Sequence, residues 1–370
     1  MKHHFRIFTV DTLIPCCAFF LALSGILTIT SGAGTWDYPL EPAMRQLGSL
    51  AVAVVIMFSA SRIDFKWLIS PATLRCAGIS GWLFLAGVLI FGTRINNMCG
   101  WYRFNSWSIQ PAEINKAIYL LILAAILAGN NCRKKFFFAL LIAAIWVIPI
   151  VLQPDYGTAV IYILLFFALA WAAGCRLRDM ALCFGAGCAA MALLFYRTPY
   201  VMKRFAGFLN GGRDNWHILQ FELTVSRGGW LGSKLGKAIW SNSYLPLAYN
   251  DSAYATLSET LGFTGAMIII LLLAVLVAAL LKSAGRTTSP AARLFITAAA
   301  ILIALQSLIH ISVNLALLPP TGLNLPFISY GGSSLTGFAL LLGLAMSAAA
   351  SGEKSQDQPD AEQDSPAADR

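Results

Sequence analysis

The sequence predicts an all-α protein that crosses a membrane many times. Hydrophobic residues make up 58% of the 370 residues and charged residues only 12%, whereas about 25% of a soluble domain is charged. Apolar runs recur along the chain, and each is long enough for a helix that crosses the bilayer. The runs do not alternate apolar and polar side chains, as the strands of a membrane barrel do. We therefore expect a polytopic helical bundle, because helices satisfy their own backbone hydrogen bonds in lipid.

About ten helices account for the apolar runs. The expected spans are 13–30, 47–61, 76–92, one ending near 129, 136–152, 158–174, 180–196, 252–281, 294–317 and one ending near 350. Basic residues cluster in alternate loops, most clearly at Arg133, Lys134 and Lys135. The positive-inside rule places these loops and both chain termini in the cytoplasm. The longest loop, 197–250, then lies outside, between the seventh and eighth helices.

The chain ends do not add a second folded unit. Residues 1–350 form the expected transmembrane domain, and 351–370 are rich in Asp, Glu, Gln and Ser. Such a composition buries too little apolar surface to order itself, so we expect a disordered acidic tail in the cytoplasm. The eight cysteines fall mostly inside apolar runs or at cytoplasmic helix ends, where we expect free thiols. The net charge of +9 divides between the inside loops and the long outside loop and does not indicate a nucleic-acid partner.

The stretch 244–265 is the strongest candidate for a site. It joins the long polar loop to an apolar span, with Asp251 at the junction and Glu259 further along. If one helix holds both, the two carboxylates lie about 12 Å apart along its axis and on similar faces. A carboxylate at the mouth of a membrane helix can reach water and lipid headgroups together. We expect Asp251 to carry the chemistry.

Other polar residues have both functional and structural interpretations. The excess of Arg and Lys in 197–250 suits a phosphate-bearing ligand, or attraction to anionic lipid headgroups. Glu113 and Lys116 are three residues apart and can pair on one helix face; such a pair marks a site or fixes the helix. Gln306, His310 and Asn314 form a stripe at spacings of four, which interhelical hydrogen bonding also explains.

Four segments of the chain resemble the SEDS family (shape, elongation, division and sporulation), which includes RodA and FtsW. The most specific is 317–335, LLPPTGLNLPFISYGGSSL, followed by 153–159, QPDYGTA. Residues 100–116 are similar to a family motif with Arg103, Gln110, Glu113 and Lys116, and 244–265 resembles the motif that carries the family aspartate. The chain departs from that motif at Leu247, Tyr249 and Thr260, where the family has Glu, His and Glu. Ala112 and Tyr156 are milder departures.

The resemblance implies a glycosyltransferase of the bacterial inner membrane that polymerises peptidoglycan strands for cell elongation or division. Its substrates would be lipid II and the undecaprenyl-linked glycan, and undecaprenyl pyrophosphate would leave. The resemblance makes Asp251 the general base, with Glu259 either supporting it or acting structurally. The expected substrate-binding residues are Arg103, Glu113, Lys116, Asp155, Arg204, Gln220, Ser329 and Tyr330.

The resemblance also implies a partner, a class B penicillin-binding protein that carries a transpeptidase. No cofactor is certain from the sequence, and a requirement for a divalent cation stays open. Two alternatives stay open from the sequence. One is a flippase or transporter of the lipid-linked precursor, with polar residues along a central path. The other is a non-catalytic scaffold for the transpeptidase, because Leu247 and Tyr249 depart from the family motif near Asp251.

Overall fold

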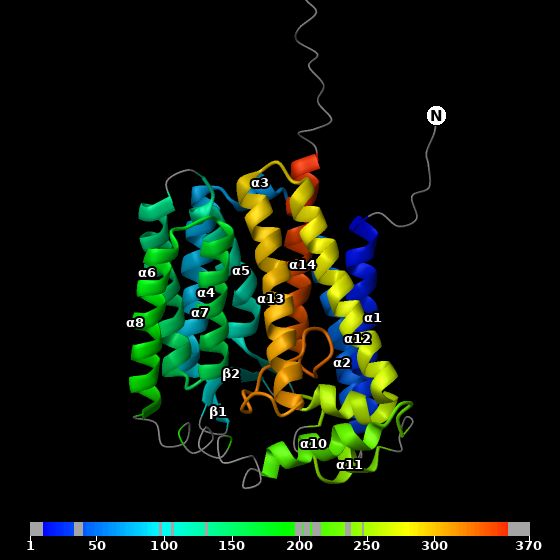
Figure 1. The fold of residues 1–370 in the computed structure, drawn as a ribbon. Coiled ribbons are helices and arrows are strands. Elements are labelled where there is room, and N and C mark those ends of the chain that lie inside the picture. The colour runs from blue at the N-terminus through cyan, green and yellow to red at the C-terminus, as the bar shows by residue number, and fades with distance from the viewer. Residues whose placement is uncertain are drawn as a thin grey trace, which may run out of the picture.

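The computed structural model describes residues 10–32, 40–95, 98–104, 107–129, 132–196, 202, 208, 216–233, 238–245 and 248–353. Long helices stand side by side in one bundle (Figure 1). They are α1 (Val10–Gly32), α2 (Glu41–Ser61), α4 (Pro71–Phe91), α5 (Pro111–Leu127), α6 (Cys132–Leu152), α7 (Tyr156–Ala172), α8 (Leu177–Tyr196), α12 (Ala253–Arg286), α13 (Pro290–Asn314) and α14 (Gly332–Glu353). The predicted all-α membrane fold is confirmed.

Seven of the described helices are long and apolar enough to cross a membrane, and Tyr156–Ala172 is a shorter apolar helix. The count of ten spans stays a prediction. α13 and α14 lie in the middle of the bundle (Figure 1), where 61% and 72% of their apolar windows are buried, whereas only 17% of the window of α4 is buried. The side chains of α13 and α14 are therefore the ones that other helices surround.

Helix starts differ from the sequence prediction where a cap precedes the apolar run. Ser70 caps α4 and Ser289 caps α13, each by accepting a hydrogen bond from a backbone N–H in the first turn and each followed by proline. Ser is a favoured cap, and proline is tolerated at the first helical position because its missing N–H is not needed there. Both helices therefore begin four or five residues before their predicted starts at 76 and 294.

Short elements cover one end of the bundle, which we call the outer end. It holds α10 (Trp216–Gly228), α11 (Ile239–Ser243) and the strands β1 (Thr93–Ile95), β2 (Met98–Phe104) and β3 (Trp107–Ile109). The described chain starts in α1 and finishes in α14 at the opposite end (Figure 1), which also carries the short helix α3 (Phe65–Leu68). The strands form an antiparallel sheet in the order β1-β2-β3, which the sequence pattern did not predict.

α12 is not the continuous helix that the apolar run predicted. Gly262 has φ 70° and ψ −171°, so the helix breaks there into two segments. The loop after α10 bonds the backbone groups beside the break: Phe263 N donates to Gly229 O at 2.8 Å, and Ser233 N donates to Glu259 O at 2.9 Å. Irregular backbone at membrane depth is tolerated where protein satisfies it in this way. The segment before the break, 253–261, begins two residues after Asp251.

Candidate active site

Asp251 lies in a turn, 248–252, at the outer end of the bundle. The residue is partly exposed. A Cβ atom on Gly322 would lie 3.7 Å from Asp251 Oδ2, so the carboxylate faces the segment 315–331 that joins α13 to α14. α12 begins at Ala253, so Asp251 and Glu259 do not share one helix face as expected. The partly exposed carboxylate therefore lies beside the irregular backbone of this segment.

Hydrogen bonds tie the Asp251 turn to the segment 315–331. Ser329 Oγ donates to Asn250 O at 2.8 Å and accepts from Leu325 N at 2.8 Å. The backbone N–H of Tyr330 donates to Tyr249 O at 2.8 Å, and the two tyrosine rings meet edge to face with centroids 5.5 Å apart. Ser329 is 3% exposed, which favours a structural role for its hydroxyl. Tyr330 is partly exposed and can still reach a ligand.

The polar stripe on α13 holds the main chain around this site. His310 Nδ1 lies 2.6 Å from Leu323 O, next to Gly322. Asn314 Nδ2 donates to Asp251 O at 2.9 Å, and Asn314 Oδ1 accepts from Ala255 N at 3.0 Å. The spacing of these residues predicted the stripe and the possibility of hydrogen bonding. That one of the partners is the main chain of Asp251 was missed, because spacing alone gives no signal for it.

Glu113 and Lys116 form the expected ion pair on α5, deep in the bundle. Lys116 Nζ lies 2.6 Å from Glu113 Oε1 and donates to Gln306 Oε1 at 2.9 Å. Lys116 is 2% exposed and Glu113 is 4% exposed. Gln306 in turn donates to Asn324 O at 2.8 Å. This arrangement favours a structural pair that links α5, α13 and the segment 315–331 over direct contact with a substrate.

Asp155 caps α7 in the turn after α6. Its Oδ1 accepts from Thr158 N and its Oδ2 accepts from Gln110 Nε2, both at 3.1 Å. Gln110 N also donates to Ser333 Oγ at the start of α14. Burial raises the pKa of the Asp155 carboxyl, and the hydrogen bonds from Thr158 act against that rise. Asp155 therefore links the start of α7 to Gln110 at the start of α5. Gln110 in turn links both to the start of α14.

Glu259 and Gln220 both form hydrogen bonds to residues of α11. Both carboxylate oxygens of Glu259 accept hydrogen bonds, from Trp240 N at 3.0 Å and from Ser241 N at 2.8 Å, and Ser241 Oγ also donates to it. Gln220 Oε1 accepts from Trp240 Nε1 at 2.7 Å. Glu259 is 2% exposed, and these three bonds join its carboxylate to α11. This favours the structural alternative for Glu259.

The remaining expected residues are only partly covered by the described chain. Arg103 lies on β2, opposite Ser108 of β3, and is exposed at the outer end. Arg204 and Leu247 lie outside the described residues. Thr260, where the family has Glu, is buried and donates to Thr256 O at 2.8 Å. Among the described residues, no group of three or more His, Cys, Asp or Glu side chains could hold a metal ion.

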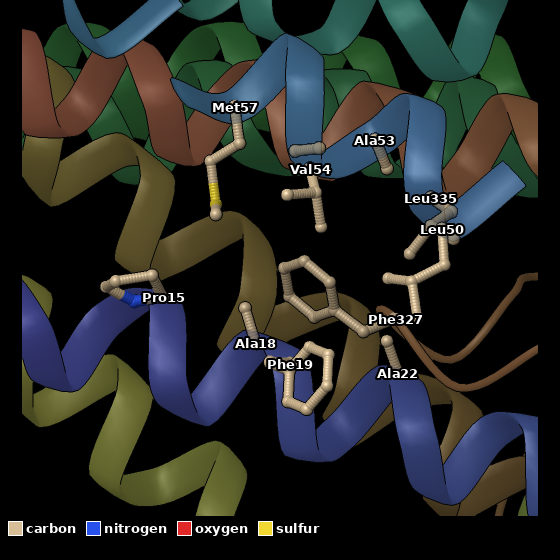
Figure 2. Close-up of a pocket in the computed structure, with 11 residues that line it drawn as sticks. Pro15, Ala18, Phe19, Ala22, Leu50, Ala53, Val54, Met57, Phe327 and Leu335 are labelled. Atoms are coloured by element: carbon tan, nitrogen blue, oxygen red, sulfur yellow. The ribbon is translucent and has the colours of Figure 1, made fainter. Parts of the chain in front are cut away.

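A small hollow with an apolar lining lies between α1 and α2. Figure 2 shows Phe327, from the segment 315–331, projecting between Phe19 and Ala22 of α1 and Val54 of α2. The full lining is Pro15, Ala18, Phe19, Ala22, Leu50, Ala53, Val54, Met57, Phe327, Leu335 and Ala339. Such a lining suits only a hydrocarbon group. Phe327 belongs to the same segment as Ser329 and Tyr330, which bond the Asp251 turn.

Comparison with known proteins identifies the family. The FtsW/RodA/SpoVE family, described as "Cell cycle protein", matches residues 11–354. The chain is 28% identical over 343 residues to "Probable peptidoglycan glycosyltransferase FtsW" of Thioalkalivibrio sulfidiphilus, covering 88% of this chain and 86% of that protein. It is 30% identical over 353 residues to "Stage V sporulation protein E" of Bacillus subtilis, covering 91% and 96%.

A solved structure shares the fold. It is described as "Structural coordination of polymerization and crosslinking by a peptidoglycan synthase complex", and one of its chains superposes with a TM-score of 0.76 at 24% identity. The match covers 92% of this chain and 98% of that one. Together with the apolar helices, these matches show a multi-pass bacterial membrane protein that belongs to the FtsW/RodA/SpoVE family, the SEDS family that its motifs resemble.

Proposed function

We propose that the protein is a peptidoglycan glycosyltransferase that polymerises lipid II, with Asp251 as its general base. The observation that carries the proposal is a partly exposed carboxylate at the outer end of a membrane bundle, in a turn that hydrogen bonds hold from α13 and from the segment 315–331. The name of the Thioalkalivibrio relative supports the same activity. A carboxylate held at the outer end could reach the sugar of a lipid-linked substrate while the lipid stays in the bilayer.

The reaction joins two lipid-linked sugars. The 4-hydroxyl oxygen of N-acetylglucosamine on one precursor attacks the anomeric carbon of N-acetylmuramic acid on the growing strand. Asp251 accepts the hydroxyl proton as the new glycosidic bond forms, and the bond to undecaprenyl pyrophosphate breaks with its electron pair on the leaving oxygen. A positioned base of this kind contributes about 10²–10⁴-fold to a rate. One base suffices, because pyrophosphate leaves without a proton.

Cations near the site would offset the charge of the departing pyrophosphate. Preorganised positive groups are most effective where water is scarce. Arg103 is exposed at the outer end, and Arg204 is the second candidate from the long loop. Lys116 contributes less directly in this proposal, because it is buried and bonded to Glu113 and Gln306. Its bonds link α5 to α13 inside the bundle.

The apolar hollow between α1 and α2 supports a lipid-linked substrate. Its lining residues are all apolar, so part of a hydrocarbon chain could lie against it while the attached sugars stay at the outer end. Burial of each CH₂ group contributes about 0.8 kcal/mol relative to water. Because a bilayer offers the chain a similar environment, the hollow would orient a prenyl chain more than it would raise the affinity.

We also propose the topology and the partner. Arg62 follows α2, Arg133 lies in the first turn of α6 and Arg286 ends α12. These helix ends lie opposite the site (Figure 1), and their basic residues fit a cytoplasmic location for that end and for both termini. A class B penicillin-binding protein is the proposed partner, because the structural neighbour comes from a complex that couples polymerisation to crosslinking. Co-purification of a transpeptidase from the native membrane would test this pairing.

The decisive experiment is polymerisation by the purified protein. Protein in lipid vesicles receives lipid II, and the products are separated by chain length on a gel. The proposal predicts glycan strands, and Asp251→Asn should make them about 10²–10⁴-fold more slowly. Translocation of labelled lipid II across the vesicle membrane without polymer would favour a flippase instead. A scaffold would make no polymer, and Tyr249→His with Leu247→Glu would not change that result.

A further inference from the structure

One side chain on α13 makes three hydrogen bonds to main-chain groups at the site. Asn314 Nδ2 donates to Asp251 O at 2.9 Å and to His310 O at 3.0 Å. Asn314 Oδ1 accepts from Ala255 N at 3.0 Å. The residue is 0% exposed. These bonds use both N–H groups of the amide and its carbonyl oxygen, so the orientation of the side chain is fully specified.

Asn314 also replaces a missing helix cap. The first N–H groups of a helix have no partner within it, and a side chain at the N-cap usually accepts from one of them. Ser252 occupies the N-cap of α12 but makes no such side-chain bond. The oxygen of Asn314 takes the place of that cap for Ala255 N, from another helix. A residue of α13 therefore helps to hold the start of α12, in addition to the residues of α12 itself.

The other members of the stripe bond elsewhere. His310 contacts Leu323 O and Gln306 contacts Asn324 O, so both hold the segment that faces the carboxylate. Among the three, Asn314 is the one whose bond reaches Asp251 itself. The backbone on each side of the carboxylate is thus held by a different residue of α13.

We propose that Asn314 is a positioning residue for the transfer reaction: the Nδ2 donor fixes the main chain at Asp251 and so aims its carboxylate. The inference rests on the proposed function, because it assigns Asn314 through the base. Proton transfer requires the base within about 2.6–3.2 Å of the hydroxyl oxygen. Without the donor, the turn before α12 can shift, and a displacement of about 1 Å can cost 10²-fold in rate.

The test separates the Nδ2 donor of Asn314, which bonds Asp251 O, from its Oδ1 acceptor, which caps α12. Asn314→Asp at pH 8 keeps an acceptor for Ala255 N and loses the donor to Asp251 O. Lipid II polymerisation by the purified variant should show a kcat lowered about 10- to 100-fold, with a KM within about threefold of wild type. The new carboxylate is buried beside two carbonyl oxygens, so the melting temperature should fall; kcat is therefore expressed per molecule that binds lipid II, with the stoichiometry of binding as the count. Asn314→Ala, which removes all three bonds, should lose at least as much kcat.

Ser307→Ala is the matched control. Ser307 lies on the same helix and is 5% exposed, and its hydroxyl has no hydrogen-bond partner among the described residues; kcat should not change. A wild-type kcat in Asn314→Asp or in Asn314→Ala overturns the inference. So does a loss of rate that equals the loss of binding stoichiometry, because that is a purely structural effect. An inactive wild type, or a fully active Asp251→Asn, would count against the proposed function instead.

Discussion

Lys116 Nζ lies 2.9 Å from Gln306 Oε1 while it pairs with Glu113 at 2.6 Å, so a buried cation joins α5 to the polar stripe of α13. Lys116→Met leaves Glu113 charged and without its partner. Breaking a buried pair in this way costs about 3–5 kcal/mol. We expect a clear drop in the unfolding temperature of the purified variant, and a partial recovery when Glu113→Leu is added.

The matched control for this prediction is Lys66→Met, at an exposed lysine, which should change stability by less than about 0.5 kcal/mol. A stable Lys116→Met with a strongly raised KM for lipid II would contradict the structural role. Lys116 would then contact the substrate, as its motif suggested.

The break in α12 depends on two glycines in close contact. A Cβ atom on Gly262 would lie 2.4 Å from Gly232 N, and Gly262 has φ +70°. Gly262→Ala must therefore strain or displace the loop that bonds the break. A non-glycine residue in such a conformation costs about 1–3 kcal/mol before any clash is counted. We expect a lower melting temperature and a reduced polymerisation rate, because the segment that begins after Asp251 moves.

Gly285→Ala gives the comparison within the same helix. A Cβ atom there meets nothing within 4 Å, and alanine is favoured over glycine in a helix by about 1 kcal/mol. This variant should be as stable as the wild type or more so. Equal behaviour of the two variants would show that the close contact at Gly262 does not matter.

Glu259 should act through α11 and not through the reaction. Glu259→Gln replaces one acceptor with a donor that faces N–H groups of Trp240 and Ser241. Leaving such buried groups unsatisfied costs about 1–3 kcal/mol. We expect reduced thermal stability with kcat per folded molecule within a few-fold of wild type, and no effect from Glu222→Gln at an exposed position. A stable variant with a hundredfold lower kcat would make Glu259 a catalytic group.

Asp155 predicts a pH dependence of stability. Burial raises the pKa of its carboxyl in the folded protein, so its contribution to stability is present below the unfolded pKa, about 3.9, and is lost as the pH rises through the folded value. Asp155→Asn removes this loss, and its carbonyl can still accept from Thr158 N. The melting temperature of the variant minus that of the wild type should therefore rise from about pH 4 toward neutral. A difference that is constant or falls over this range contradicts the assignment.

Hydrophobicity predicted most of the fold. The apolar runs located the long helices, because a helix in lipid must be apolar along its length. The break at Gly262 was missed because apolar residues continue on both sides of it, and only the loop after α10 explains why it is tolerated. The strands β1 to β3 were missed because they are short and lie among residues that the motif marked for chemistry.

The site was predicted less completely. Spacing placed Gln306, His310 and Asn314 on one face, but the partner of Asn314 lies 63 residues earlier in the chain, and such contacts depend on how the helices pack. The partners of Lys116 and Glu259 could not be predicted from the sequence for the same reason. Each has the residue type of a catalytic or binding group, and only the structure shows that Glu113, Gln306, Trp240 and Ser241 bond to them.

The most direct measurement is the polymerisation rate of Asp251→Asn, set beside Asp251→Glu and wild type at equal lipid II occupancy. The amide keeps the shape of the side chain and cannot accept the proton, so kcat should fall about 10²–10⁴-fold while lipid II still binds. Asp251→Glu should retain part of the rate, because it keeps a base at a displaced position. An Asp251→Asn protein that binds lipid II and makes strands at the wild-type rate would contradict the assignment of the base.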